Sequence, residues 1–293
     1  MTAPATPRDG SRYLDALEGE RARWWSGANF DTWKRLYTSE HARGHYLVEL
    51  LRTYVPDFDV RGARILDVGC GDAGVPIAFA EHGAVASGVE PSAESLRRGA
   101  LRAEEHGVSV DLRAGVAETL PYPDASFDFL ILDNVLEHVV DPPRALAEAR
   151  RVLRPGALLY VVTPKPFALY SLYNDPHYDL AGLVLLPRRW QIWYFERVRG
   201  GGTGTYDVGT IPTRRALRRG LAAAGFAPVV SPRELWVRYV RDRVSRPDEV
   251  RPGLKRTLAA WCARREWPFA HPVMRWLWDV AMGSNMILAR RTP

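Results

Sequence analysis

The sequence is poor in cysteine and in long apolar runs. Its two cysteines, Cys70 and Cys262, cannot build a disulfide framework, and neither has a Cys or His neighbour at metal-ligand spacing. Residues 1–10 contain no apolar stretch of signal-peptide length, and the longest apolar run, 180–186, is far shorter than the ~20 residues of a membrane span. We therefore expect a chain that is neither exported nor membrane-spanning and that resides in the cytoplasm.

Lysine is also scarce. The formal net charge is +6, but of the 40 basic residues only Lys34, Lys165 and Lys255 are lysines. This arginine bias is typical of a GC-rich coding sequence, and no compact basic stripe with interleaved aromatics is present, so we do not expect nucleic acid as a partner. The 293 residues, 46% hydrophobic and 25% charged, suffice for one large α/β domain with insertions.

From Arg64 onward, short apolar segments alternate with amphipathic ones. The predicted strands are 65–68, 84–89, 108–112, 129–132, 158–162, 229–237 and 285–289. The predicted helices are 75–80, 92–106, 141–153 and 212–224, the third with Asp141 as its N-cap. Repeated βα units cross over right-handed, so we predict an α/β fold with a doubly wound, mostly parallel seven-stranded sheet.

Two stretches interrupt this rhythm and define the expected organisation. The predicted parts are an N-terminal helical cap (1–60), a core (61–165), an aromatic insertion (166–212) and the end of the sheet (213–293) with a second insertion at 241–282. Both insertions should cap the carboxyl edge of the sheet, where ligands bind in such folds. The first is either a substrate lid or the core of a cap subdomain, and the second, rich in tryptophan, either contacts a membrane surface or packs on the core.

A glycine-rich turn, 67–74, follows the first predicted strand and opens a helix. Its glycines let the backbone approach a ligand, and the helix N-terminus offers unpaired N–H groups to an anionic group. Glu90, at the end of the next strand, can accept protons from both hydroxyls of a ribose. The turn also satisfies the dinucleotide pattern G-x-G-x-x-G, so these features suit either NAD or an adenosyl sulfonium.

Five segments in order distinguish the two cofactors. They are DVGCG at 67–71, VEPS at 89–92, AETLPYPDASFD at 117–128, VLEHVVDP at 135–142 and LRPGA at 153–157. Together they resemble the motifs of class I S-adenosylmethionine-dependent methyltransferases, in the small-molecule branch that includes ubiquinone-type O-methyltransferases. The resemblance implies S-adenosylmethionine as cofactor, S-adenosylhomocysteine as product, and methyl transfer to a small molecule. We expect the acceptor to be a hydroxyl of a secondary metabolite, a glycan or a lipid-linked compound. An NAD-dependent oxidoreductase and a non-catalytic binding domain are the alternatives.

The resemblance also implies which residues contact the cofactor. The methionine portion is expected to contact the turn at Asp67, Gly69, Cys70, Gly71 and Gly74. The ribose is expected to contact Glu90 and Pro91. The adenine is expected to contact Val116, Ala117 and Glu118, and Asn134 is a further expected contact. One departure is Val116, because family members usually carry an acidic residue there to accept from the adenine amino group. The backbone N–H of Ala117 could still serve the adenine.

Two histidines are candidate catalytic bases, since imidazole titrates near neutral pH. His138 follows the fourth predicted strand and is either such a base or a helix-start residue bonded to backbone. His177 lies in the aromatic insertion, where we favour a functional role. Some quinone-type relatives bind a divalent ion through Glu-x-x-Glu-His at this point, but here Asn134 replaces one carboxylate, so we expect no metal there.

Overall fold

The protein is built on one seven-stranded sheet. The computed structural model describes residues 11–19, 27–165, 180, 182–199, 209, 211–231, 234–235, 238 and 284–293. The strands are β1 (Arg64–Val68), β2 (Val85–Glu90), β3 (Asp111–Ala114), β4 (Phe127–Asp133), β5 (Leu153–Pro164), β6 (Phe226–Pro228) and β7 (Ser284–Arg291). Their order is β3-β2-β1-β4-β5-β7-β6, in which β1 to β5 run parallel and β7 is antiparallel to both neighbours. The predicted doubly wound, mostly parallel α/β fold is confirmed.

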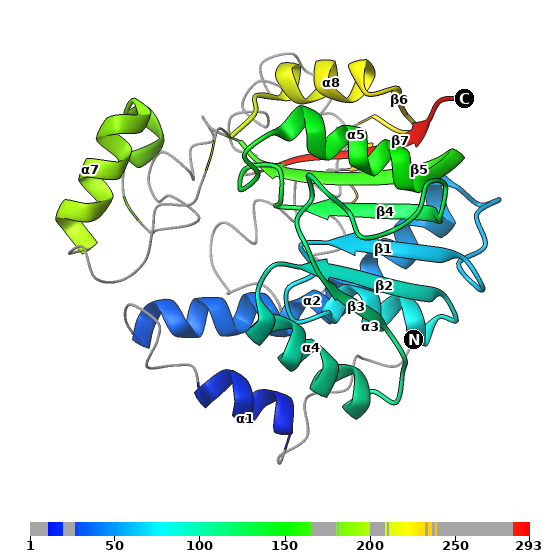
Figure 1. The fold of residues 1–293 in the computed structure, drawn as a ribbon, viewed down its shortest axis with the longest axis horizontal. Helices are drawn as coiled ribbons and strands as arrows, with labels where there is room; N and C mark the ends of the chain where they lie inside the picture. The colour runs from blue at the N-terminus through cyan, green and yellow to red at the C-terminus, as the bar shows by residue number, and fades with distance from the viewer. Residues whose placement is uncertain are drawn as a thin grey trace.

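Helices cover both faces of this sheet (Figure 1). They are α1 (Arg12–Gly19), α2 (Gly27–Tyr54), α3 (Gly74–Glu81), α4 (Ala93–Glu105), α5 (Pro142–Val152), α7 (Arg188–Arg199) and α8 (Arg214–Ala223), with a short 3-10 turn, η2 (Leu183–Leu185). The α5 helix begins as predicted, because the Asp141 side chain accepts a hydrogen bond from the Arg144 N–H and Pro142 occupies the first turn.

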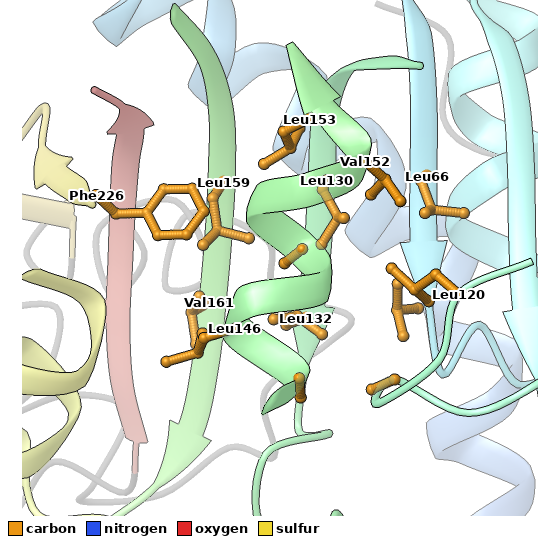
Figure 2. Close-up of a cluster of buried hydrophobic side chains, with 14 of the residues drawn as sticks. Leu66, Leu120, Leu130, Leu132, Leu146, Val152, Leu153, Leu159, Val161 and Phe226 are labelled. Atoms are coloured by element: carbon orange, nitrogen blue, oxygen red, sulfur yellow. The ribbon is translucent and has the colours of Figure 1, made fainter. Parts of the chain in front are cut away.

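The alternation of β4 side chains explains the two layers. Phe129 and Ile131 pack in one buried cluster with α2 and α3, whereas Leu130 and Leu132 pack in another with α5 and α8. Figure 2 shows the second cluster, with Leu146 of α5 over the central strands. A stretch of strand with both faces buried must be apolar throughout, which is how residues 129–132 of β4 read in the sequence.

One predicted strand is wrong. The sequence pattern places a strand at 229–237, but β6 ends at Pro228. The Ser231 hydroxyl and carbonyl both accept from the Glu234 N–H, which starts a helical turn, and Leu235 is buried through that turn against the α2 side of the sheet. A short apolar run can be buried as a strand or as a helical turn, and here the hydrogen bonds of Ser231 favour the turn.

The described part of the aromatic insertion is helical. Leu183 and Phe195 form a small buried cluster of their own, while Trp190 and Trp193 are 46% and 54% exposed. Figure 1 shows α7 standing apart from the sheet on the side where the parallel strands end. His177 and the tryptophan-rich stretch 241–282 lie outside the described residues. Among the described helices, none is long and apolar enough to cross a membrane.

Candidate functional site

The glycine-rich turn bends sharply at the carboxyl end of β1. The N–H groups of Gly69 and Cys70 both donate to the Val89 carbonyl of β2, at 2.7 and 3.1 Å. Gly69 has φ +71°, and a Cβ there would lie 2.7 Å from Cγ2 of Val135. Gly71 also has positive φ, +51°. Only glycine adopts this bend without strain, so the turn keeps its backbone free of side chains at the strand end.

Glu90 ends β2 directly beside this turn. Its Oε2 accepts from the Gly71 N–H at 3.2 Å and its Oε1 accepts from the Ser92 N–H at 3.1 Å. Burial raises the pKa of Glu90, although these two N–H donors oppose the shift. The carboxylate is therefore held in one orientation, and each oxygen keeps a lone pair for a ligand hydroxyl.

Cys70 and Gly74 shape the turn from its inner side. A Cβ on Gly88 of β2 would lie 2.6 Å from the Cys70 Sγ, and burial raises the pKa of that thiol well above its usual value. A Cβ on Gly74 would lie 2.5 Å from Cβ of Glu40 in α2. The Cys70 side chain thus packs on a strand and Gly74 allows two helices to touch, which leaves the backbone as the part of either residue that could contact a ligand.

Five ionisable side chains, three acidic and two basic, lie together beneath the turn. Asp67 of β1 and Glu40 of α2 are buried, and Arg43 of α2 pairs with Asp133 of β4 at 2.9 Å between Nη1 and Oδ2. Burial, and then the charges of Asp133 and Glu40, raise the pKa of Asp67 well above its usual range, while Arg43 lowers it. Burial likewise raises the pKa of Glu40 to about 8. Glu40 also lies 3.5 Å from Arg102 of α4, between Oε2 and Nη1. Three carboxyl groups therefore share two guanidiniums here, so the site favours a cationic ligand group.

Two arginines of α4 hold this arrangement in place. Arg98 binds the Asp72 carboxylate through Nε and Nη2 at 2.8–3.0 Å, and both side chains are almost fully buried. One helical turn later, Arg102 donates to the carbonyls of Tyr37 and Thr38 in α2. The α4 helix therefore links the glycine-rich turn to α2, and both are positioned by the same helix face.

The predicted adenine segment forms a tight turn after β3. Val116 and Thr119 make an isolated bridge, with Val116 half exposed and Ala117 buried. The Glu118 Oε1 accepts from the N–H groups of Val140 and Asp141, at 2.8 and 3.3 Å. The Glu118 side chain thus fastens this turn to the start of α5, as does the Glu118 carbonyl, which accepts from Arg144 Nε at 3.0 Å.

Asn134 and His138 follow the end of β4. Asn134 has φ +57°, and its side-chain amide donates to the Asp133 carboxylate at 2.8 Å. The His138 backbone N–H donates to the Val135 carbonyl, and its side chain is exposed. Pro91 is exposed beside Glu90. Because β4 and β2 both flank β1, these residues lie at the same sheet edge as the glycine-rich turn.

Residues of α2 and α4 were not expected at this site from the sequence. Glu40 and Arg43 come from the segment predicted only as a helical cap, and no local motif marks them. No local pattern marks Arg98 and Arg102 either, because two like charges four residues apart on a helix do not by themselves predict a buried ion pair.

Comparison with known proteins agrees with this geometry. A family model described as "Methyltransferase domain" matches residues 66–161. A ubiquinone biosynthesis O-methyltransferase of Maricaulis maris (strain MCS10) is 38% identical over 183 residues, covering 58% of this chain and 71% of that protein. One of Chelativorans sp. (strain BNC1) is 32% identical over 164 residues, covering 56% of this chain and 58% of that protein, so the chain spans less than two thirds of that relative. The S-adenosylmethionine-dependent methyltransferase structure from Mesorhizobium loti shares the fold, at 21% identity and a TM-score of 0.52, over 83% of this chain and 96% of that one.

The site fits the cofactor of those relatives. S-adenosylmethionine carries an ammonium and a sulfonium, whose positive charges would lower the raised pKa values of the buried Asp67 and Glu40 carboxyls and favour their ionised form. It also carries a ribose diol, which suits Glu90. A Cβ on Gly71 would lie 2.8 Å from Oε1 of Glu40, so only a bare backbone leaves this space open. The relatives confirm the predicted fold class and the predicted cofactor. The chain belongs to the class I S-adenosylmethionine-dependent methyltransferases.

Proposed function

We propose that the protein transfers a methyl group from S-adenosylmethionine to a hydroxyl oxygen of a small-molecule acceptor. One observation carries the proposal: the buried carboxyls of Asp67 in β1 and Glu40 in α2 lie near the oriented carboxylate of Glu90 at the end of β2. The similarity to O-methyltransferases supports oxygen as the accepting atom. The family assignment disfavours the NAD-dependent alternative.

The chain's own residues mainly bind and orient. When bound, S-adenosylmethionine supplies an activated methyl group on a sulfonium. Asp67 and Glu40 would hold its ammonium, and Glu90 would accept from its ribose hydroxyls. In-line transfer to an oxygen requires the acceptor to be held on the opposite side of the methyl carbon and to lose its proton, so positioning accounts for much of the rate. His138, exposed at the same sheet edge, is our candidate to accept that proton, and His177 is the second.

The described part of the insertion supports an apolar acceptor. The exposed indole rings of Trp190 and Trp193 contact each other edge to face, with centroids 5.7 Å apart, on the helix that stands beyond the carboxyl ends of the strands. Aromatic side chains left exposed beside a ligand site are typical of surfaces that bind apolar or ring-bearing molecules. We propose that α7 contacts the acceptor.

The proposal is tested by label transfer. Purified protein with S-adenosylmethionine tritiated on its methyl group is incubated with a panel of phenols, sugars, aliphatic alcohols and amines, and products are identified by mass spectrometry. We expect label in at least one hydroxyl-bearing acceptor and a strong loss of rate in the His138→Asn variant without loss of cofactor binding. Label found only in amines would refute O-methylation, and tight cofactor binding with no transfer to any acceptor would favour a non-catalytic domain.

We also propose a cytoplasmic location without nucleic acid as a partner. The low cysteine content and the buried free thiol of Cys70 support a reducing compartment. A peripheral membrane contact through the tryptophan-rich stretch is a further proposal, and it is tested by cosedimentation of the protein with anionic vesicles.

A further inference from the structure

Four of the seven histidines of the sequence gather around one glutamate, far along α3 from the glycine-rich turn. This histidine cluster consists of His41, His45, Glu81, His82 and His106. The first two histidines lie one turn apart on α2, Glu81 and His82 are at the end of α3, and His106 directly follows α4. Three helices that are distant in sequence therefore bring their imidazoles to one point.

The distances within the histidine cluster are short. The Glu81 carboxylate lies 2.8 Å from His41 Nε2, 3.1 Å from His45 Nε2 and 2.8 Å from His106 Nδ1. One ligand atom from each of His41, Glu81 and His106 lies within 4.8 Å of the other two. Four ligands around a tetrahedral zinc ion stand roughly 3.3 Å apart, since each bond is about 2.0–2.1 Å. Small side-chain movements would therefore admit an ion.

We propose that the histidine cluster binds one divalent transition-metal ion, with zinc as the representative, through His41, Glu81, His106 and His45. Imidazole and carboxylate are the ligands that zinc takes in proteins, and three histidines with one acid complete a tetrahedral set. Each imidazole comes from a helix or its end, so the backbone already fixes the approach of the ligands. This site is separate from the position after β4 where the sequence predicts no metal.

The surroundings of the ligands support binding. His45 Nδ1 lies 3.0 Å from His82 Nε2, a hydrogen bond that turns the His45 Nε2 toward Glu81, as the partners of metal-binding histidines commonly do. The side chains of His41, Glu81 and His106 are 11%, 27% and 26% exposed, which shelters an ion but leaves it a way in.

The position of the site indicates a structural role. The seven steps from Gly74 to Glu81 in α3 place Glu81 roughly 10 Å along the helix, at the opposite end from the cofactor turn. A bound ion would join α2 to the ends of α3 and α4. His41 is the neighbour in sequence of Glu40, so the ion would also steady the helix that carries Glu40 and Arg43 into the cofactor site.

Zinc binding to the whole protein tests the proposal, without reference to methyl transfer. Protein treated with a chelator and dialysed is titrated with zinc chloride against a chromophoric competitor, and retained zinc is measured by mass spectrometry after gel filtration. We expect one zinc per chain and a rise in melting temperature of ~4 °C or more at saturating zinc. Glu81→Gln and His106→Asn should each weaken binding by about tenfold or more.

The controls separate this site from general histidine binding. His138→Asn removes a histidine outside the histidine cluster and should bind zinc as the unchanged protein does. If Glu81→Gln does not fold, His106→Asn alone decides, because His106 lies at the end of α4 and is partly exposed. Less than one tenth of an equivalent of zinc retained, or equal affinity in His106→Asn and His138→Asn, would overturn the proposal, whatever the outcome of the methyl-transfer assay.

Discussion

Replacing Glu90 with glutamine tests the cofactor site at its most specific point. Glu90→Gln keeps the shape of the side chain but removes its charge, and its single oxygen can serve one of the two backbone donors, Gly71 or Ser92. A hydrogen bond to a charged group contributes about 1.5–3 kcal/mol. Loss of the charged acceptor for a ribose diol should therefore cost about 2 kcal/mol, which is a rise of about thirtyfold in Kd.

The same substitution should leave the fold nearly unchanged. Burial already raises the pKa of Glu90, so removing its charge relieves desolvation while one backbone hydrogen bond is lost, and the unfolding free energy should change by less than about 1 kcal/mol. Glu94→Gln is the matched control, because Glu94 is exposed in the first turn of α4.

Isothermal titration calorimetry with two ligands separates contacts to the ribose from contacts to the amino-acid portion of the cofactor. S-adenosylhomocysteine and methylthioadenosine share the ribose, but only the first carries the amino-acid ammonium, so Glu90→Gln should weaken both by a similar factor. Glu40→Gln, by contrast, should weaken S-adenosylhomocysteine alone. An affinity of Glu90→Gln within about twofold of the control variant, for both ligands, would refute the role of this carboxylate in holding the ribose.

Three further predictions concern the supports of the site. Arg98→Met should destabilise the protein by about 3–5 kcal/mol in urea unfolding, because it leaves Asp72 buried without its ion-pair partner, and a loss below ~1 kcal/mol would contradict this. Gly69→Ala should cost about 1–2 kcal/mol more than Gly107→Ala, since both have positive φ but only the first lacks room for a Cβ, and equal costs would show that the backbone conformation alone matters. Between about pH 4.5 and 8 the folded protein holds the Glu40 proton more tightly than the unfolded chain, so that carboxyl makes stability fall as pH rises. The stability of Glu40→Gln relative to the unchanged protein should therefore rise by ~1 kcal/mol or more from pH 5 to pH 8, and a pH-independent difference would argue against a buried, protonated Glu40.

The residues around the glycine-rich turn show what sequence reasoning could reach. Asp67, Gly69, Gly71 and Glu90 lie at strand ends, and their spacing along the chain follows directly from the βαβ unit. Because neighbouring parallel strands end at the same edge of the sheet, local sequence patterns predicted that these residues lie close together, and they also predicted the cofactor. The predicted strand at 229–237 failed for the opposite reason, since a short apolar run is compatible with a strand or a buried turn.

The sequence by itself determined the class of fold, the cofactor and the position of Glu90 beside the glycine-rich turn, because each depends on residues close together along the chain. The tertiary structure alone decided which charges lie beneath the turn. Glu40 and Arg43 lie on α2, a helix that precedes β1 in the sequence. The hydrophobic periodicity of a helix does not predict which strand ends that helix packs against. The histidine cluster is of the same kind, since Glu81 and His106 meet His41 only through the packing of three helices, whose contacts depend on side-chain fit across the whole domain.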